Sequence, residues 1–126
     1  MSEPLTAPVI LALRASVADY EPACLALAVI EDCEGNLEDA AISLAIRTGQ
    51  QPNADNALWL AALAKRCRAK ICQPELRQAI AAERWGEAAQ ALATTKLIPD
   101  LLALPVLLYV QQQGLDDFCA PLEGVI

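Results

Sequence analysis

The sequence predicts an all-α protein, a compact bundle of six to eight short helices in a helical-hairpin arrangement. Apolar residues recur with the helical period along nearly the whole chain, and no segment shows the strict alternation of a half-buried strand. The composition includes 25 alanines and 20 leucines, which are strong helix formers. Because a chain of 126 residues fits one core, we expect residues 1–126 to form a single all-helical domain.

Three helices are predicted in the first part of the chain. The first spans about residues 7–18 and ends before Pro22, which opens the second because a first helical turn does not need its N–H. Residues 23–30 are apolar on every side, so we expect the second helix to be central. The third begins after Asn36, a favourable N-cap residue, and ends at Gly49.

Residues 50–53 are the best loop candidate, and the charge of the chain reverses there. Residues 1–55 hold nine acids and two bases, whereas residues 56–100 hold four acids and seven bases. We therefore expect an acidic half, 1–52, and a basic and apolar half, 54–126, that pack together.

A long amphipathic helix and a tight helical pair are predicted next. The long helix runs from about residue 55 to residue 72, with a stripe of apolar side chains along one face. Pro74 then restarts the chain, and residues 75–83 and 85–96 form the pair. The alanine-rich faces of the two helices allow them to approach closely.

Residues 97–110 form the longest apolar stretch, and we expect them to be a buried core helix. Prolines interrupt the stretch, which is shorter than the roughly 20 residues of a membrane span. Pro105 is expected to kink this segment or divide it into two short helices. For residues 115–126 the expectation is a short turn and a loosely held tail.

The five cysteines indicate neither a disulfide framework nor a zinc site, because they are odd in number and show no C-x2-C spacing. Cys67 lies between two arginines, which would activate a thiol, but it falls on the apolar stripe, which favours a core position. Cys72, near a basic helix end, is the better candidate for a reactive thiol. Cys24, Cys33 and Cys119 have no distinguishing context. We expect reduced thiols, and the acidic amino terminus lacks the start of a signal peptide, so the predicted location is cytoplasmic.

The most localised charge feature is a basic cluster in the second half, which comprises Lys65, Arg66, Arg68, Lys70, Arg77 and Arg84. Cations at a helix C-terminus stabilise it by about 0.3–1 kcal/mol each, so the cluster has a purely structural interpretation. The functional interpretation is a contact with an acidic partner, including the acidic half of a second copy. Trp59 favours this interpretation, because Trp59, Arg66 and Lys70 share one edge of the apolar stripe and Trp and Arg are enriched in interface hot spots.

The chain contains no histidine and no glycine-rich phosphate loop or nucleophile elbow. We therefore expect a small soluble helical module for protein–protein interaction, without catalytic activity, metal or cofactor. The alternative is a cysteine-dependent redox or covalent ligand-attachment protein that uses Cys67 or Cys72. A third interpretation, a nucleic-acid-binding bundle that uses residues 65–84, is disfavoured by the net charge of −7.

Overall fold

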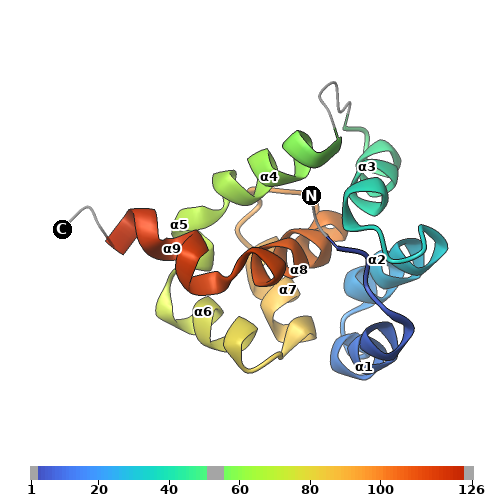
Figure 1. Ribbon diagram of the computed structural model, residues 1–126, viewed down its shortest axis with the longest axis horizontal. Coiled ribbons are helices and arrows are strands. Elements are labelled where there is room, and N and C mark those ends of the chain that lie inside the picture. Colours follow the sequence, from blue (N-terminus) through green and yellow to red (C-terminus); the bar gives the residue numbers. More distant parts are fainter. Residues whose placement is uncertain (1–2, 51–55, 124–126) are drawn as a thin grey trace.

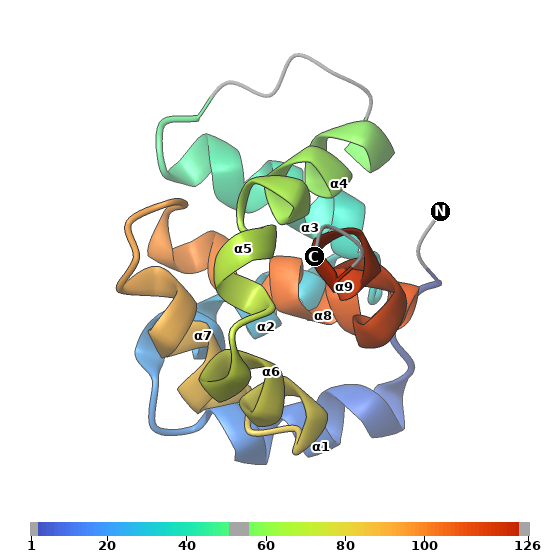
Figure 2. The ribbon, with the colours of Figure 1, turned by 90° about the vertical axis from the view of Figure 1, so that its left-hand side faces the viewer.

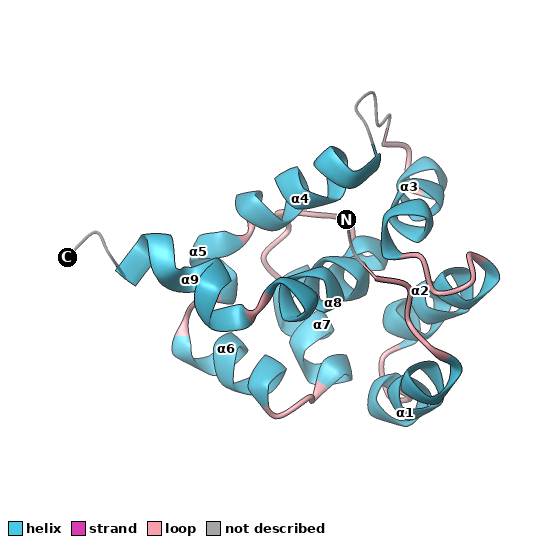
Figure 3. Cartoon of the chain, in the orientation of Figure 1, coloured by secondary structure: helices cyan, strands magenta, loops and turns pink. Residues whose placement is uncertain are grey.

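Helices account for all the regular structure in residues 3–50 and 56–123, the part of the chain that the computed structural model describes (Figure 1). No strand occurs in these residues (Figure 3), which confirms the all-α prediction. The helices are α1 (Ala7–Val17), α2 (Glu21–Asp32), α3 (Leu37–Arg47), α4 (Asn56–Arg66), α5 (Arg68–Ile71), α6 (Pro74–Ala81), α7 (Trp85–Ala93), the 3-10 helix η1 (Asp100–Leu102), α8 (Ala103–Gln113) and α9 (Leu115–Glu123). The predicted loop at residues 50–53 lies mostly outside the described residues.

The boundaries of α3 follow from its end residues, as the sequence predicts. The Asn36 side chain accepts a hydrogen bond of 2.9 Å from the backbone N–H of Asp39, which satisfies an otherwise unpaired donor of the first turn. At the other end Gly49 adopts a φ of +84°, a left-handed conformation that favours glycine and stops the helix.

The centre of the molecule is α8, which contacts α2, α3, α4, α7 and α9 (Figures 1 and 2). Its residues 103–108 are all buried, which confirms a core helix over this part of the predicted segment 97–110, whereas residues 97–99 are not helical and Leu97 is exposed. The segment is divided into two helices, as predicted, but the division lies before Pro105, between η1 and α8. Pro105 lies in the first turn of α8, where its missing N–H is not required. By contrast α2, predicted to be central, keeps one side at the surface, where Leu25 is 49% exposed.

The predicted long helix over residues 55–72 is wrong in one respect, because it breaks at Cys67. The backbone N–H of Cys67 bonds the carbonyl of Ala64, three residues back, and the helical path is lost for one residue before α5 begins. The reason is tertiary. Cys67 and Ile71 are both fully buried, and the turn brings α5 against α6 and α9.

The prediction of a loosely held tail over residues 115–126 is also wrong for the described part. Gly114, with a φ of +98°, ends α8, and the chain then forms α9. Phe118 and Cys119 of α9 are buried. Leu115, Phe118 and Cys119 have the i, i+3, i+4 spacing of an amphipathic helix, which is the signal that sequence reasoning missed.

Candidate functional site

Five of the six predicted cations lie on the consecutive helices α4, α5 and α6, and we call them the basic corner: Lys65, Arg66, Arg68, Lys70 and Arg77. Figure 2 shows these three helices one after another along one side of the molecule, with α9 beside α5. The basic corner is built by the end of α4 and by the turns that follow it. These turns bring α5 against α6 and α9 while Cys67 and Ile71 stay buried.

Lys65 and Arg66 are exposed at the C-terminal end of α4, where their charges complement the helix dipole. Lys70 is half-buried on α5. Within residues 3–50 and 56–123 none of these three cations forms an ion pair. Their charges therefore remain available to a partner.

Arg68 and Arg77 are instead occupied by α9. The guanidinium carbon of Arg68 lies 4.7 Å from the centre of the Phe118 ring, a cation–π contact. The Arg77 guanidinium forms an ion pair of 2.8 Å with Asp116. Lys65, Arg68, Asp117 and Phe118 also line one shallow hollow of about 250 Å³ between α4 and α9. The first turns of α9 thus place two carboxylates and an aromatic ring on the basic corner.

The remaining predicted site residues are placed differently. Trp59 is half-buried on α4 and packs against the core. Because the helix breaks at Cys67, Trp59 shares a continuous helix with Arg66 but no longer with Lys70. Arg84 does not join the basic corner. It pairs with Glu87 on α7 and lines a separate hollow with Asp19 and Tyr20, next to α1.

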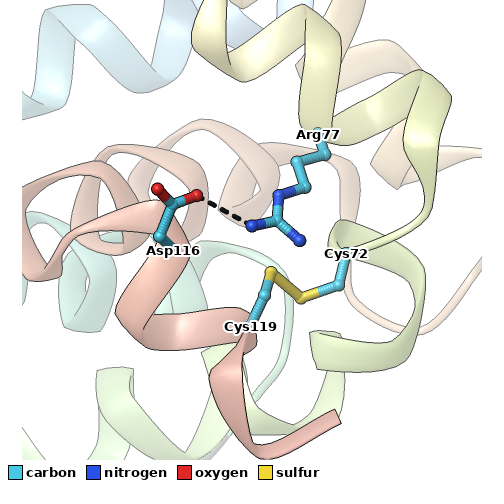
Figure 4. The surroundings of a disulfide bond; sticks show 4 residues. All are labelled: Cys72, Arg77, Asp116 and Cys119. Carbon is cyan, nitrogen blue, oxygen red and sulfur yellow. Dashed lines mark hydrogen bonds and ion pairs between the residues drawn. A yellow bond between two sulfur atoms is a disulfide. The ribbon is translucent and has the colours of Figure 1, made fainter. Parts of the chain in front are cut away.

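A disulfide joins Cys72, at the end of α5, to Cys119 in α9 (Figure 4). The two Cα atoms are 5.7 Å apart although 47 residues separate the cysteines in the sequence. The expectation that all thiols are reduced is therefore wrong for Cys72 and Cys119. No spacing motif in the sequence predicts this pair, because only the packing of α9 on α5 brings the two residues together.

Three cysteines remain free: Cys24, Cys33 and Cys67. Cys67 is fully buried, which confirms its predicted core position. Burial raises the pKa of the Cys67 thiol, and the smaller opposing effect of Arg66 does not cancel it. Burial, together with Asp39 and Asp32, also raises the pKa of Cys33. At neutral pH these two thiols are poor sources of thiolate.

The described residues contain no group of three or more metal-ligating side chains that could hold a metal ion. Over the same residues, no helix has the length and apolar character needed to span a bilayer. No model of a protein family matches the chain, and neither does any curated protein or solved structure with which it was compared.

Proposed function

We propose that this protein is a small soluble cytoplasmic module for protein–protein interaction, without catalytic activity, that binds an acidic surface of its partner through the basic corner. The observation that carries the proposal is the concentration of five cations on three consecutive short helices of a protein whose net charge is −7. In such a protein a basic surface is not a by-product of composition. An arginine-rich surface next to an exposed helix end is typical of contacts with carboxylates.

The arrangement of the whole molecule supports this proposal. The basic corner lies at one end of the long axis with α5, α6 and α9, whereas the acidic helices α2 and α3 lie at the other end (Figure 1). Although α9 adds Asp116 and Asp117 to the basic end, the separation steers an acidic partner toward the exposed cations Lys65 and Arg66 and repels it from the α2–α3 end. A second copy of the chain is one such partner, because its α2–α3 end carries the complementary charge.

The cysteine-dependent alternative has less support from the positions of its two residues. Cys67 is buried and its pKa is raised by burial, whereas the sulfur of Cys72 is bonded to Cys119. Neither residue presents a free thiolate to a substrate. A reactive role for Cys72 would first require reduction of the disulfide.

The test compares two charge reversals that are matched in chemistry and context. Arg66 and Arg47 are the last residues of α4 and α3, and both are exposed. Each of the variants Arg66→Glu and Arg47→Glu lowers the net charge equally, but only the first changes the basic corner. We expect Arg66→Glu to weaken binding of a fluorescent decaglutamate peptide about tenfold at low salt, and Arg47→Glu to leave it nearly unchanged.

The same titration includes a 20-base-pair duplex DNA as a second polyanion. Equal peptide binding by the two variants would remove the basic corner from the interface, and tighter binding of the duplex than of the peptide would favour the nucleic-acid interpretation. Sedimentation of the unmodified protein at low and high salt shows whether the partner is a second copy. A different partner is sought by affinity capture from the native host, with the Arg47→Glu and Arg66→Glu variants as baits. Such a partner is the protein that Arg47→Glu captures and Arg66→Glu does not.

A further inference from the structure

The first half of α9 occupies the basic corner as an acidic partner would. Asp116 pairs with Arg77, Asp117 lines the same hollow as Lys65 and Arg68, and Phe118 receives the Arg68 guanidinium on its ring. This segment is acidic at its start and carries one aromatic anchor. Charge complementarity and the cation–π contact make it an internal ligand for the surface that we assign to the partner.

The ion pair and the helix by itself are too weak to hold α9 in place. Asp116 is 92% exposed, so its ion pair with Arg77 is screened by solvent. The helix has only nine residues, fewer than an isolated helix needs to be stable in water. Gly114, with a φ of +98°, joins α9 to α8 in a backbone conformation that favours glycine. Burial of Phe118 and Cys119 against the core and the Cys72–Cys119 bond therefore carry most of the attachment.

The disulfide stands at the centre of this attachment. Figure 4 shows the Cys72–Cys119 bond beside the Arg77–Asp116 pair, with one cysteine on each side of the contact between α5 and α9. Cys72 is partly exposed, whereas Cys119 is fully buried. Of the two cysteines, only Cys72 has surface that an external thiolate can contact. In a reducing cytoplasm a disulfide of this kind is usually transient and regulatory.

We propose that the Cys72–Cys119 disulfide is a redox latch that holds α9 over the basic corner, and that its reduction by a dithiol releases α9 and opens Arg68 and Arg77 to an acidic, aromatic-anchored segment of a partner. A thiolate of the dithiol attacks the Cys72 sulfur, and the Cys119 thiolate leaves and takes up a proton. The second thiol of the reductant then displaces Cys72. The protein gains two electrons and two protons, and the dithiol becomes a disulfide.

Release of α9 is measured without any partner, by hydrogen–deuterium exchange of the full-length chain. We use a Cys24→Ser/Cys33→Ser background, which removes the two partly buried free thiols, and compare the oxidised protein with the protein reduced by dithiothreitol. Amides of residues 115–123 should exchange at least tenfold faster after reduction, whereas those of α8 stay protected. Unchanged exchange in α9, with reduction verified by mass, would overturn the latch.

Two variants separate the latch from a general loss of structure. Cys72→Ser should show fast exchange in α9 without any reductant, because it removes the partly exposed half of the bond and leaves the buried Cys119 in place. Asp116→Asn removes the ion pair but keeps the disulfide, so its oxidised form should stay as protected as the parent. Fast exchange in oxidised Asp116→Asn would show that the ion pair and not the disulfide holds α9.

Opening of the basic corner is measured with a fluorescent peptide of residues 115–123 that carries serine at 119. The reduced protein and Cys72→Ser should bind it several-fold more tightly than the oxidised protein does, and a peptide with both aspartates changed to asparagine should bind all forms weakly. Equal affinity in both redox states would overturn the coupling of the latch to the surface. This part rests on the proposed function, which the Arg66→Glu titration tests separately, so the two can fail independently.

Discussion

At the scale of single residues, burial controls the chemistry of the cysteines more than neighbouring charge does. Cys67 has an arginine on each side in the sequence, yet its side chain is fully buried and burial raises its pKa. Cys67 lies at the turn between α4 and α5 with its side chain in the core, whereas Arg66 is exposed and Arg68 lies against the Phe118 ring. Desolvation then outweighs the attraction between the thiolate and Arg66.

This raised pKa leads to a prediction for alkaline pH. The unfolded chain loses its Cys67 proton near pH 8.5, whereas the folded protein holds it to higher pH. The stability contributed by the neutral thiol is therefore complete below about pH 8.5 and is lost as the pH rises through the folded pKa. We expect the free energy of unfolding to fall less between pH 7.5 and pH 10 in Cys67→Ala than in the parent.

The measurement is urea unfolding of both oxidised proteins at the two pH values. The change in unfolding free energy between the two pH values is compared, because the cost of the cavity left by Cys67→Ala is the same at both and cancels. Burial also raises the pKa of Tyr20 and Tyr109, with smaller effects from Asp100 and Glu38, so the parent should lose further stability at still higher pH. If the unfolding free energy fell equally with pH in both proteins, the loss of stability could not be assigned to Cys67.

At the scale of elements, the contact between α1 and α7 shows how a segment distant in the chain supplies hydrogen-bond partners to a helix end. Arg84, at the N-cap position of α7, makes no capping hydrogen bond with its side chain. The hydroxyl of Ser16 accepts the backbone N–H of Trp85 at 2.9 Å and donates to the carbonyl of Glu83 at 3.0 Å. An α1 side chain thus supplies the partner that the first turn of α7 lacks.

Gly86 is the residue that permits this close approach, and it provides a prediction with an unusual sign. A Cβ at this position would lie 2.8 Å from the backbone oxygen of Ser16 and 3.3 Å from the Cα of Val17. Within a helix, replacement of glycine by alanine normally stabilises by up to about 1 kcal/mol. Here we expect Gly86→Ala to destabilise by about 1–3 kcal/mol, because backbone atoms must move apart.

The control is Gln90→Ala, an exposed position on the same helix, which should change stability by less than about 0.5 kcal/mol. Both variants are compared with the parent by urea denaturation. A stabilising effect of Gly86→Ala would mean that α1 and α7 do not approach as closely as described.

At the scale of the whole molecule, the disulfide connects two parts of the second half that are far apart in the chain. It closes a loop over a sequence separation of 47 residues, and it ties α9 to a bundle organised around α8. Cross-linking of a loop of this length restricts the unfolded chain and is worth at most about 4 kcal/mol in the chain-entropy description.

We therefore expect reduction to lower the free energy of unfolding by about 2–4 kcal/mol, measured as the urea midpoints of the oxidised and reduced forms of the Cys24→Ser/Cys33→Ser background. If reduction also releases α9, the reduced form buries less surface, and its dependence on urea concentration should be shallower. Superimposable unfolding curves in the two redox states would show that the disulfide makes no contribution to the fold.

Charge is also organised at the scale of the whole molecule. The acidic helices α2 and α3 and the basic corner lie at opposite ends of the long axis (Figure 1). The sequence order already separates the two charge types, and the fold keeps them apart. The start of α9 departs from this separation, because it returns to the basic corner and contacts Arg77 and Arg68, and so do Arg47 on α3 and Glu75 on α6.

Features that depend on neighbours within about four residues could be predicted from local sequence patterns. Asn36 and Gly49 set the ends of α3, the apolar period set the helical class, and the apolar stripe placed Cys67 in the core. Helix formation and capping are local, so a short window of sequence contains most of the information about them.

Tertiary structure decided the rest, because the deciding contacts join residues that are distant in the chain. Packing broke the predicted long helix at Cys67, turned the predicted tail into α9, and separated Arg84 from the basic corner. The Cys72–Cys119 bond depends on the docking of α9 against α5, and no local pattern in the sequence encodes that docking. The cations of the candidate site were thus predictable from the sequence, whereas the position of α9 over them and the Cys72–Cys119 bond were not.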